Sequence, residues 1–179
     1  IVSDPNKYSM YAILKKEDQT IDNSIFGDGV YLANLNSKKQ IVICGLRNKL
    51  ESFKEKYPLG KYIPLNVSAP FHSELMNDSS KIFYNKITDI HFSDINTDVI
   101  SNHKLVNYKD MHSSEYSNQL TLQIHSPVMW SDTIHKIISS NVDSFIEIGP
   151  KKTLLNFLPR SFSGDKISIT NSEEINNYV

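Results

Sequence analysis

Short apolar runs separated by polar turns dominate the first third of the chain. Runs rich in β-branched and aromatic residues predict strands at residues 10–14 (MYAIL), 30–35 (VYLANL), 40–44 (QIVIC) and 62–67 (YIPLNV). Apolar residues at helical spacing opposite charged ones predict a helix over residues 47–57, and a more polar helix is predicted over residues 16–24. After a connector at residues 1–9, this order predicts a ferredoxin-like βαββαβ unit over residues 10–68.

The pattern changes after residue 68, where apolar residues recur at helical spacing over longer stretches. Helices are predicted at residues 72–90, 113–124, 131–140 and 151–158. Strands are predicted between or after them at residues 99–101, 144–148 and 166–170. Strands separated by helices favour parallel pairing. The predicted fold class is therefore α/β, with residues 69–179 forming part of a larger subdomain.

Composition and charge exclude several classes of protein. The formal net charge is −1, with both signs interspersed, so the chain has no electrostatic footprint for nucleic acid or an anionic membrane. No apolar run approaches the roughly 20 residues that span a bilayer. A single cysteine, Cys44, excludes an intramolecular disulfide and favours a reducing, cytoplasmic compartment. The first residues lack the features of a signal peptide and an initiator methionine, which suggests a chain that begins inside a larger protein.

The window NVSAPFHSELM, residues 66–76, contains the first candidate for chemistry. A strand is predicted to end here, Pro70 prevents its continuation, and a helix is predicted to begin after His72. The partial positive charge of a helix N-terminus would favour the neutral imidazole and so suit a general base. A hydrogen-bonded structural histidine fits the same spacing, and at this point both interpretations stay open.

Other polar residues give weaker signals. The remaining histidines form no paired arrangement with metal-ligand spacing, so no metal site is predicted; they are His91, His103, His112, His125 and His135. Cys44 lies in the apolar run IVICG and is predicted to be a core residue with a raised pKa. The chain contains neither a glycine-rich phosphate loop nor a Gly-x-Ser-x-Gly nucleophile elbow.

Five windows in register carry a resemblance to a known family. They are MYAILK, ANLNSKKQIVICG, IPLNVSAPFHSELM, PVMW and FIEIGPKKTL, and together they extend over most of the chain. In this order they resemble the C-terminal portion of the malonyl-CoA:acyl carrier protein transacylases of fatty acid and polyketide synthesis. The resemblance implies that residues 69–179 are the C-terminal part of an α/β-hydrolase-like large subdomain.

The same resemblance implies roles for individual residues. The histidine of SAPFHS is His72, which in the family takes the proton from a serine hydroxyl as that serine attacks the acyl thioester. Gln123 is expected to offer its backbone carbonyl to the ring of His72 and orient it. Asn34 and Asn36 resemble residues near the acyl pocket. Both also suit a plain turn.

Phe71 bears on substrate selectivity. In the resembling family a bulky Phe at this position accompanies malonyl, because its ring fills the space of a branching methyl group. Excluding one methyl group discriminates by only about 1 to 3 kcal/mol, so the resemblance implies a preference for malonyl. A core aromatic would satisfy the same pattern.

The departures from the family limit what this chain is expected to do alone. The Gly-His-Ser-x-Gly elbow and the carboxylate-binding arginine of the family correspond to positions before Ile1, and the arginines present, Arg47 and Arg160, do not match. We therefore expect the nucleophilic serine to come from a missing N-terminal segment and the 179-residue chain alone to be inactive. The family's Gly-Pro-Gly-Lys turn is Gly-Pro-Lys-Lys here, from residue 149.

The predicted function is transfer of a malonyl group from coenzyme A to acyl carrier protein by a Ser/His ping-pong mechanism. No cofactor is expected, since the CoA thioester is a substrate and the phosphopantetheine belongs to the carrier. A modest basic patch of Lys151, Lys152 and Arg160 is expected to dock the acidic carrier protein. The alternatives are an acyl hydrolase of the same fold and a non-catalytic carrier-protein docking domain.

Overall fold

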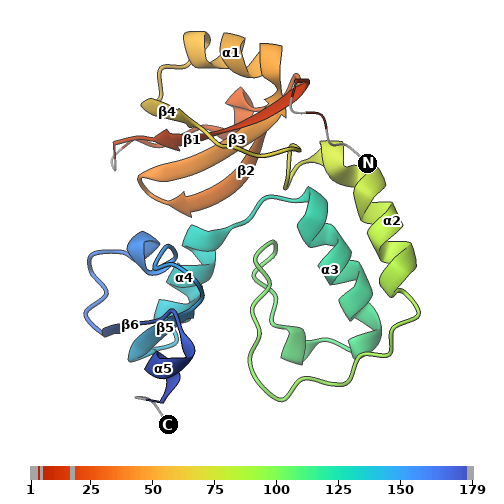
Figure 1. Cartoon of the computed structure of the whole chain (residues 1–179), viewed down its shortest axis with the longest axis vertical. Helices are drawn as coiled ribbons and strands as arrows, with labels where there is room; N and C mark the ends of the chain where they lie inside the picture. Colours follow the sequence, from red (N-terminus) through yellow and green to blue (C-terminus); the bar gives the residue numbers. More distant parts are fainter. Residues whose placement is uncertain (1–3, 5, 17–18, 177–179) are drawn as a thin grey trace.

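A computed structural model describes residues 4, 6–16 and 19–176 (Figure 1). Within these residues the first part of the chain forms an antiparallel sheet in the order β2-β3-β1-β4. The strands are β1 (Tyr8–Leu14), β2 (Val30–Ser37), β3 (Gln40–Leu46) and β4 (Lys61–Pro64). All four predicted strands are confirmed, although β4 ends at Pro64, earlier than predicted.

Alternation along β1 and β3 gives the sheet two apolar faces. On one face Ile13 and Ile43 pack with Leu50 and Phe53 of α1 (Arg47–Lys56). On the opposite face Ala33 and Cys44 belong to a second buried cluster. Strands buried on both faces explain the near-continuous apolar runs in the sequence. Of the predicted connector, residues 1–3 and 5 lie outside the described residues, and β1 begins at Tyr8.

The helix predicted over residues 16–24 is wrong for the part that the structure describes, while residues 17 and 18 lie outside it. A single 3₁₀ turn, Asn23–Ile25, is present there. The carboxylate of Asp22 accepts the N–H of Ser24 at 2.9 Å, a local bond that favours a turn over a helix.

Two helices pack side by side after the sheet (Figure 1). They are α2 (Asn77–Ile87), preceded by a 3₁₀ turn at Glu74–Met76, and α3 (Tyr116–His125). The hydroxyl of Ser117 donates to the carbonyl of Ile87 at 3.1 Å and ties one helix to the other. In the connecting segment, the strand predicted at residues 99–101 is reduced to an isolated bridge between Ile100 and Asn107.

The last part of the chain contains α4 (Trp130–Ile138), β5 (Ser144–Ile148), β6 (Asp165–Ile169) and the short α5 (Ser172–Ile175). The predicted parallel pairing is confirmed, since β5 and β6 are parallel in the described part of the chain. The helix predicted over residues 151–158 is wrong: only the 3₁₀ turn Leu155–Phe157 forms there. The carboxylate of Glu147 accepts the N–H groups of residues 153–155 at 2.9 to 3.0 Å and ties this segment to β5.

A short backbone seam connects the antiparallel sheet to the segment between α3 and α4. The N–H of Leu35 donates to the carbonyl of Val128, and the N–H of Val128 donates to the carbonyl of Ala33, both at 2.8 Å. The α/β class is thereby confirmed, with both sheets and helices in one arrangement (Figure 1). None of the helices described is at once long and apolar enough to cross a bilayer.

Candidate active site

His72 stands in a tight, well-bonded bend between β4 and α2. Its φ is +61°, in the left-handed region that costs a non-glycine residue about 1 to 2 kcal/mol. The bend is held by the Ser73 hydroxyl, which donates to the carbonyl of the buried Pro70 at 2.6 Å. The backbone conformation is therefore imposed by the surroundings and fixes where the ring of His72 points.

The imidazole of His72 is oriented by the last turn of α3. Its Nδ1 lies 3.0 Å from the carbonyl oxygen of Gln123, and its backbone N–H donates to the carbonyl of Ile124 at 3.2 Å. Because a carbonyl only accepts, Nδ1 carries the hydrogen, and the neutral ring presents the lone pair of Nε2. The contact expected between His72 and the Gln123 carbonyl is present, while the catalytic roles of both residues stay predictions.

His72 lies close to two helix ends. A helical segment begins two residues after it, as the 3₁₀ turn Glu74–Met76, which continues directly into α2 at Asn77. The predicted helix start after His72 is therefore confirmed, although its first turn is 3₁₀ and not α-helical. The ring also contacts the C-terminal turn of α3 through the carbonyl of Gln123.

The side chain of Gln123 is itself held by a tyrosine. Its Nε2 donates to the hydroxyl of Tyr108 at 2.8 Å, and Tyr108 is 5% exposed. Burial raises the pKa of Tyr108 and keeps it a neutral phenol, although hydrogen bonds with Gln123 and Ser101 partly oppose that shift. Tyr108 gives no signal in the sequence, because it lies in a polar segment without periodicity.

A cavity of about 430 Å³ opens beside His72. Phe26, Leu32 and Pro127 contribute to its wall. Among the described residues that line it, Phe71 is not present, and the Phe71 side chain is 39% exposed. The arrangement leaves room for an acyl group next to the ring and does not test the selectivity expected of Phe71.

The two asparagines predicted near the acyl pocket lie on β2. Asn34 forms a bridge with Val128, and the Asn36 side chain donates to Oε1 of Gln40 at 2.8 Å. Neither belongs to the described lining of the cavity at His72. Their substrate-binding roles stay predictions, and the structure assigns Asn36 a contact within the β2–β3 hairpin.

The cations predicted to dock a carrier protein lie on two different segments. Lys151 and Lys152 are exposed on the loop after β5, not on a helix as predicted. Arg160 lines a cavity of about 390 Å³ together with Lys38 and Lys39 of the β2–β3 turn, and the described lining of this cavity contains no acidic residue. The two hairpin lysines could not be predicted to belong to this patch, because only folding brings them close to Arg160.

Cys44 lies in the core of the antiparallel sheet, as predicted. Cys44 is fully buried, and desolvation raises the pKa of its thiol to about 12. Among the described residues, no group of three or more His, Cys, Asp or Glu side chains is placed to hold a metal ion.

Comparisons with known proteins agree with this arrangement. The malonyl CoA-acyl carrier protein transacylase of Bacillus subtilis (strain 168) is 38% identical over 132 residues, which are 72% of this chain and 41% of that protein. A crystal structure of malonyl CoA-acyl carrier protein transacylase from Clostridium perfringens matches with a TM-score of 0.84 and 30% identity, over 99% of this chain and 57% of that one. This chain belongs to the malonyl CoA-acyl carrier protein transacylase family.

Another relative is named for polyketide biosynthesis. A polyketide biosynthesis malonyl CoA-acyl carrier protein transacylase, BaeC of Bacillus velezensis, is 32% identical over 133 residues, 72% of this chain and 45% of that protein. No protein-family model matches the chain. The chain spans 41% and 45% of these two transacylases, less than half the length of each.

Proposed function

We propose that this chain supplies the histidine base of a transacylase that moves a malonyl group from coenzyme A to acyl carrier protein. The observation that carries the proposal is the Nδ1 contact of His72 with the Gln123 carbonyl, which leaves Nε2 free to act as a base. The names of the related proteins supply malonyl CoA and the acyl carrier protein as the two substrates.

The proposed mechanism is ping-pong acyl transfer. Nε2 of His72 takes the proton of a serine hydroxyl while the serine oxygen attacks the carbonyl carbon of the malonyl thioester. The carbon–sulfur bond breaks, and the departing CoA thiolate receives that proton from the imidazolium. The carrier's phosphopantetheine thiol then attacks the malonyl-serine ester in the same way and regenerates the serine. No cofactor takes part in these steps.

The nucleophile in this proposal comes from residues outside these 179, since the sequence has no Gly-x-Ser-x-Gly elbow. Two exposed apolar side chains of β5 are evidence for such a segment. Ile146 is 51% exposed and Ile148 is 76% exposed on a parallel pair of strands, whereas parallel sheets are normally covered on both faces. We propose that the segment which brings the serine also covers this face.

The proposed division into subdomains follows from the two sheets. The order β2-β3-β1-β4 is that of a ferredoxin-like sheet, which supports such a subdomain over residues 10–68 without its first helix in the described part. Residues 69–179, with the parallel pair β5 and β6, are proposed as the C-terminal part of an α/β-hydrolase-like subdomain.

The carrier protein is proposed to dock through exposed cations. Lys151, Lys152 and Arg160 are exposed, and acidic partners are steered by such charges. Reversing Lys151 and Lys152 to Glu should slow association with the carrier and weaken its dependence on salt. The predicted cytoplasmic location accords with the single, buried cysteine and stays a proposal.

The decisive experiment follows malonyl transfer from malonyl-CoA to holo acyl carrier protein by intact-protein mass spectrometry. It uses this chain together with the segment that carries the serine. His72→Ala should slow transfer by about 10²-fold or more, while His112→Ala, an exposed histidine, serves as the matched control. Equal rates for the two variants would overturn the proposal. Free malonate without carrier loading would indicate the hydrolase instead.

The chain alone provides a second test. Without a serine nucleophile and its oxyanion-hole amide, we expect no covalent malonyl adduct on the 179 residues after exposure to malonyl-CoA. An adduct at stoichiometric yield would contradict the assignment of the nucleophile to another segment.

A further inference from the structure

We infer that Tyr108 is a positioning residue, which acts through Gln123 to keep the ring of His72 in the Nδ1–H form. The effect of Tyr108 on catalysis rests on the proposed function, whereas its effect on the orientation of the His72 ring does not. Tyr108 contacts neither His72 nor the cavity beside it in the described structure. Tyr108 would therefore affect His72 only through Gln123.

The orientation of His72 depends on the part of a helix that is least stable by itself. Carbonyls in the last turn of a helix have no partners four residues further along, and this turn frays readily. The carbonyls of Gln123 and Ile124 lie in this turn of α3, and both accept hydrogens from His72. Any fraying of the turn would move both acceptors away from the histidine.

Tyr108 connects this last turn to the first turn of the same helix. Its hydroxyl accepts from the Gln123 side chain at 2.8 Å, near the end of α3. At the beginning of α3, the Tyr116 hydroxyl donates to the Tyr108 carbonyl at 3.0 Å, and the two rings pack edge to face with centroids 5.3 Å apart. Tyr108 thus acts as a brace along the whole helix.

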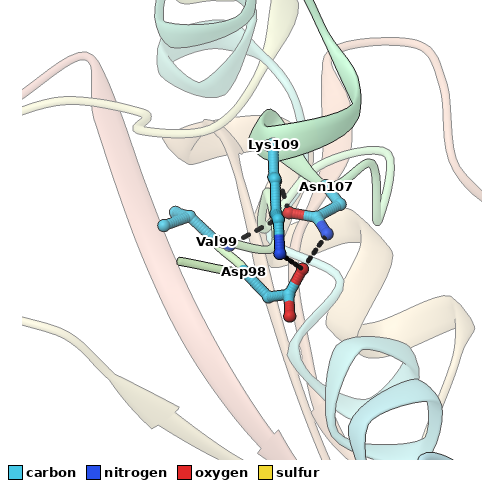
Figure 2. A network of polar contacts seen from close by, with 4 residues as sticks. All are labelled: Asp98, Val99, Asn107 and Lys109. Carbon is cyan, nitrogen blue, oxygen red and sulfur yellow. Dashed lines mark hydrogen bonds and ion pairs between the residues drawn. The ribbon is translucent and has the colours of Figure 1, made fainter. Parts of the chain in front are cut away.

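The brace is anchored by a polar clamp around Asn107 (Figure 2). The Asn107 side-chain oxygen accepts the N–H groups of Val99 and Lys109 at 3.0 and 3.2 Å, and its nitrogen donates to Asp98 at 2.6 Å. The N–H of Tyr108 donates to the carbonyl of Val99 at 2.9 Å. These bonds fix the segment that carries Tyr108, so its hydroxyl meets Gln123 at a fixed place.

Loss of the Tyr108 hydroxyl would leave the half-buried Gln123 amide without its acceptor. A polar group in that position is costly when unsatisfied, so the side chain is expected to turn toward water and loosen the last turn of α3. His72 Nδ1–H would then lose its partner, and the ring would populate the other tautomer. This effect separates positioning from a general loss of stability.

Nuclear magnetic resonance on the 179-residue chain tests the inference without any activity. In the unaltered chain, two-bond ¹H–¹⁵N couplings of the His72 ring should report the Nδ1–H tautomer. Tyr108→Phe and Gln123→Met should each raise the other tautomer and speed exchange of the His72 backbone amide by about tenfold, the range of one net hydrogen bond. Together they should have no more effect than either alone.

The control is Tyr62→Phe, which removes a tyrosine hydroxyl from a different hydrogen bond, one that donates to the carbonyl of Tyr57 at 2.6 Å. Exchange of the Ile43 amide in the sheet core serves as the measure of global unfolding. A His72 tautomer that is unchanged in both Tyr108→Phe and Gln123→Met would overturn the inference, as would an equal change in Tyr62→Phe.

An activity measurement separates this inference from the proposed function. With the serine-bearing segment present, Tyr108→Phe should lower kcat for malonyl transfer several-fold and leave KM nearly unchanged, because the brace does not touch substrate. If Tyr108→Phe shifts the His72 tautomer but the unaltered protein shows no transfer activity, the positioning role of Tyr108 stands and the proposed function is overturned. A shifted tautomer with unchanged kcat would overturn the catalytic part of the inference.

Discussion

Phe71 stands 39% exposed directly beside His72, whose left-handed backbone at φ +61° redirects the chain between the two side chains. The imidazole is bound against α3, while the phenyl ring has no such anchor in any contact described here. The two neighbours therefore differ in freedom, and a change at Phe71 can alter the approach to the base without displacing it.

Replacing Phe71 with Ser should widen the acyl preference. We expect the ratio of kcat/KM for methylmalonyl over malonyl to rise by about tenfold or more, since one methyl group in a pocket is worth about 1 to 3 kcal/mol. Competition between the two thioesters, with products separated by mass, measures this ratio. Phe83→Ser, on an exposed phenylalanine of α2, is the control. An unchanged ratio in Phe71→Ser would remove Phe71 from the specificity of the site.

Cys44 should be inert in the folded chain. Burial raises its thiol pKa from 9.0 to about 12, which reduces the thiolate available for reaction by about a thousandfold. Alkylation by iodoacetamide at pH 8 should therefore be at least that much slower in the native protein than in denaturant. Rapid native labelling would mean that the apolar cluster around β3 opens easily.

Glu147 should make stability depend on acid. Partial desolvation opposes its ionisation, but hydrogen bonds from Leu154, Leu155 and Thr153 outweigh that cost and lower its pKa below 4.5. A carboxyl with a lowered pKa stabilises the folded state above its unfolded pKa, and this contribution is lost as the pH falls through the folded value. Glu147→Gln should therefore lower the free energy of unfolding by about 1 kcal/mol at pH 7, and this difference between the two proteins should shrink below pH 4.5.

Urea unfolding of the parent chain and the Glu147→Gln variant at several pH values measures this difference. Glu55→Gln, at an exposed position of α1, controls for loss of one charge. A stability difference that persists unchanged in acid would contradict the role given to the ionised carboxylate.

Asn107 should determine the order of the segment before α3. Asn107→Ala removes the three side-chain hydrogen bonds of the clamp in Figure 2, one of which, from the N–H of Lys109, caps the 3₁₀ turn Tyr108–Asp110. A loss of about 1 kcal/mol is expected from the cap. Amide exchange at Val99 and Lys109 should accelerate, whereas Asn118→Ala, on the exposed side of α3, should leave it unchanged. Equal protection in both variants would show that the clamp is dispensable.

Elements with strong local signals could be predicted from the sequence. The strands β1 and β3 follow from β-branched runs, and α1 follows from Leu50 and Phe53 at helical spacing. The helix predicted over residues 151–158 is not present, and the amides of residues 153–155 instead donate to the carboxylate of Glu147 on β5. No local pattern within the loop reveals that interaction.

The candidate site, too, could be predicted only in part from local sequence. The window around His72 identified the residue and the helix that begins after it, whereas no local pattern shows that the ring contacts the carbonyl of Gln123, 51 residues later in the chain. Tyr108 gave no signal, since a tyrosine in a polar segment is ordinary and its bond to Gln123 exists only in the folded chain. Residue identity was readable from sequence, whereas the partners that give it an environment were not.

The seam at Val128 has a consequence for how this protein tolerates change. Both hydrogen bonds between β2 and this residue are made by main-chain atoms, with Ala33 and Leu35. An alanine scan would leave them intact, because among the natural residues only proline lacks the N–H that Leu35 and Val128 donate. Only a change of the backbone, such as an ester in place of the Val128 amide, would measure how much these hydrogen bonds contribute to holding the segment after α3 against the sheet.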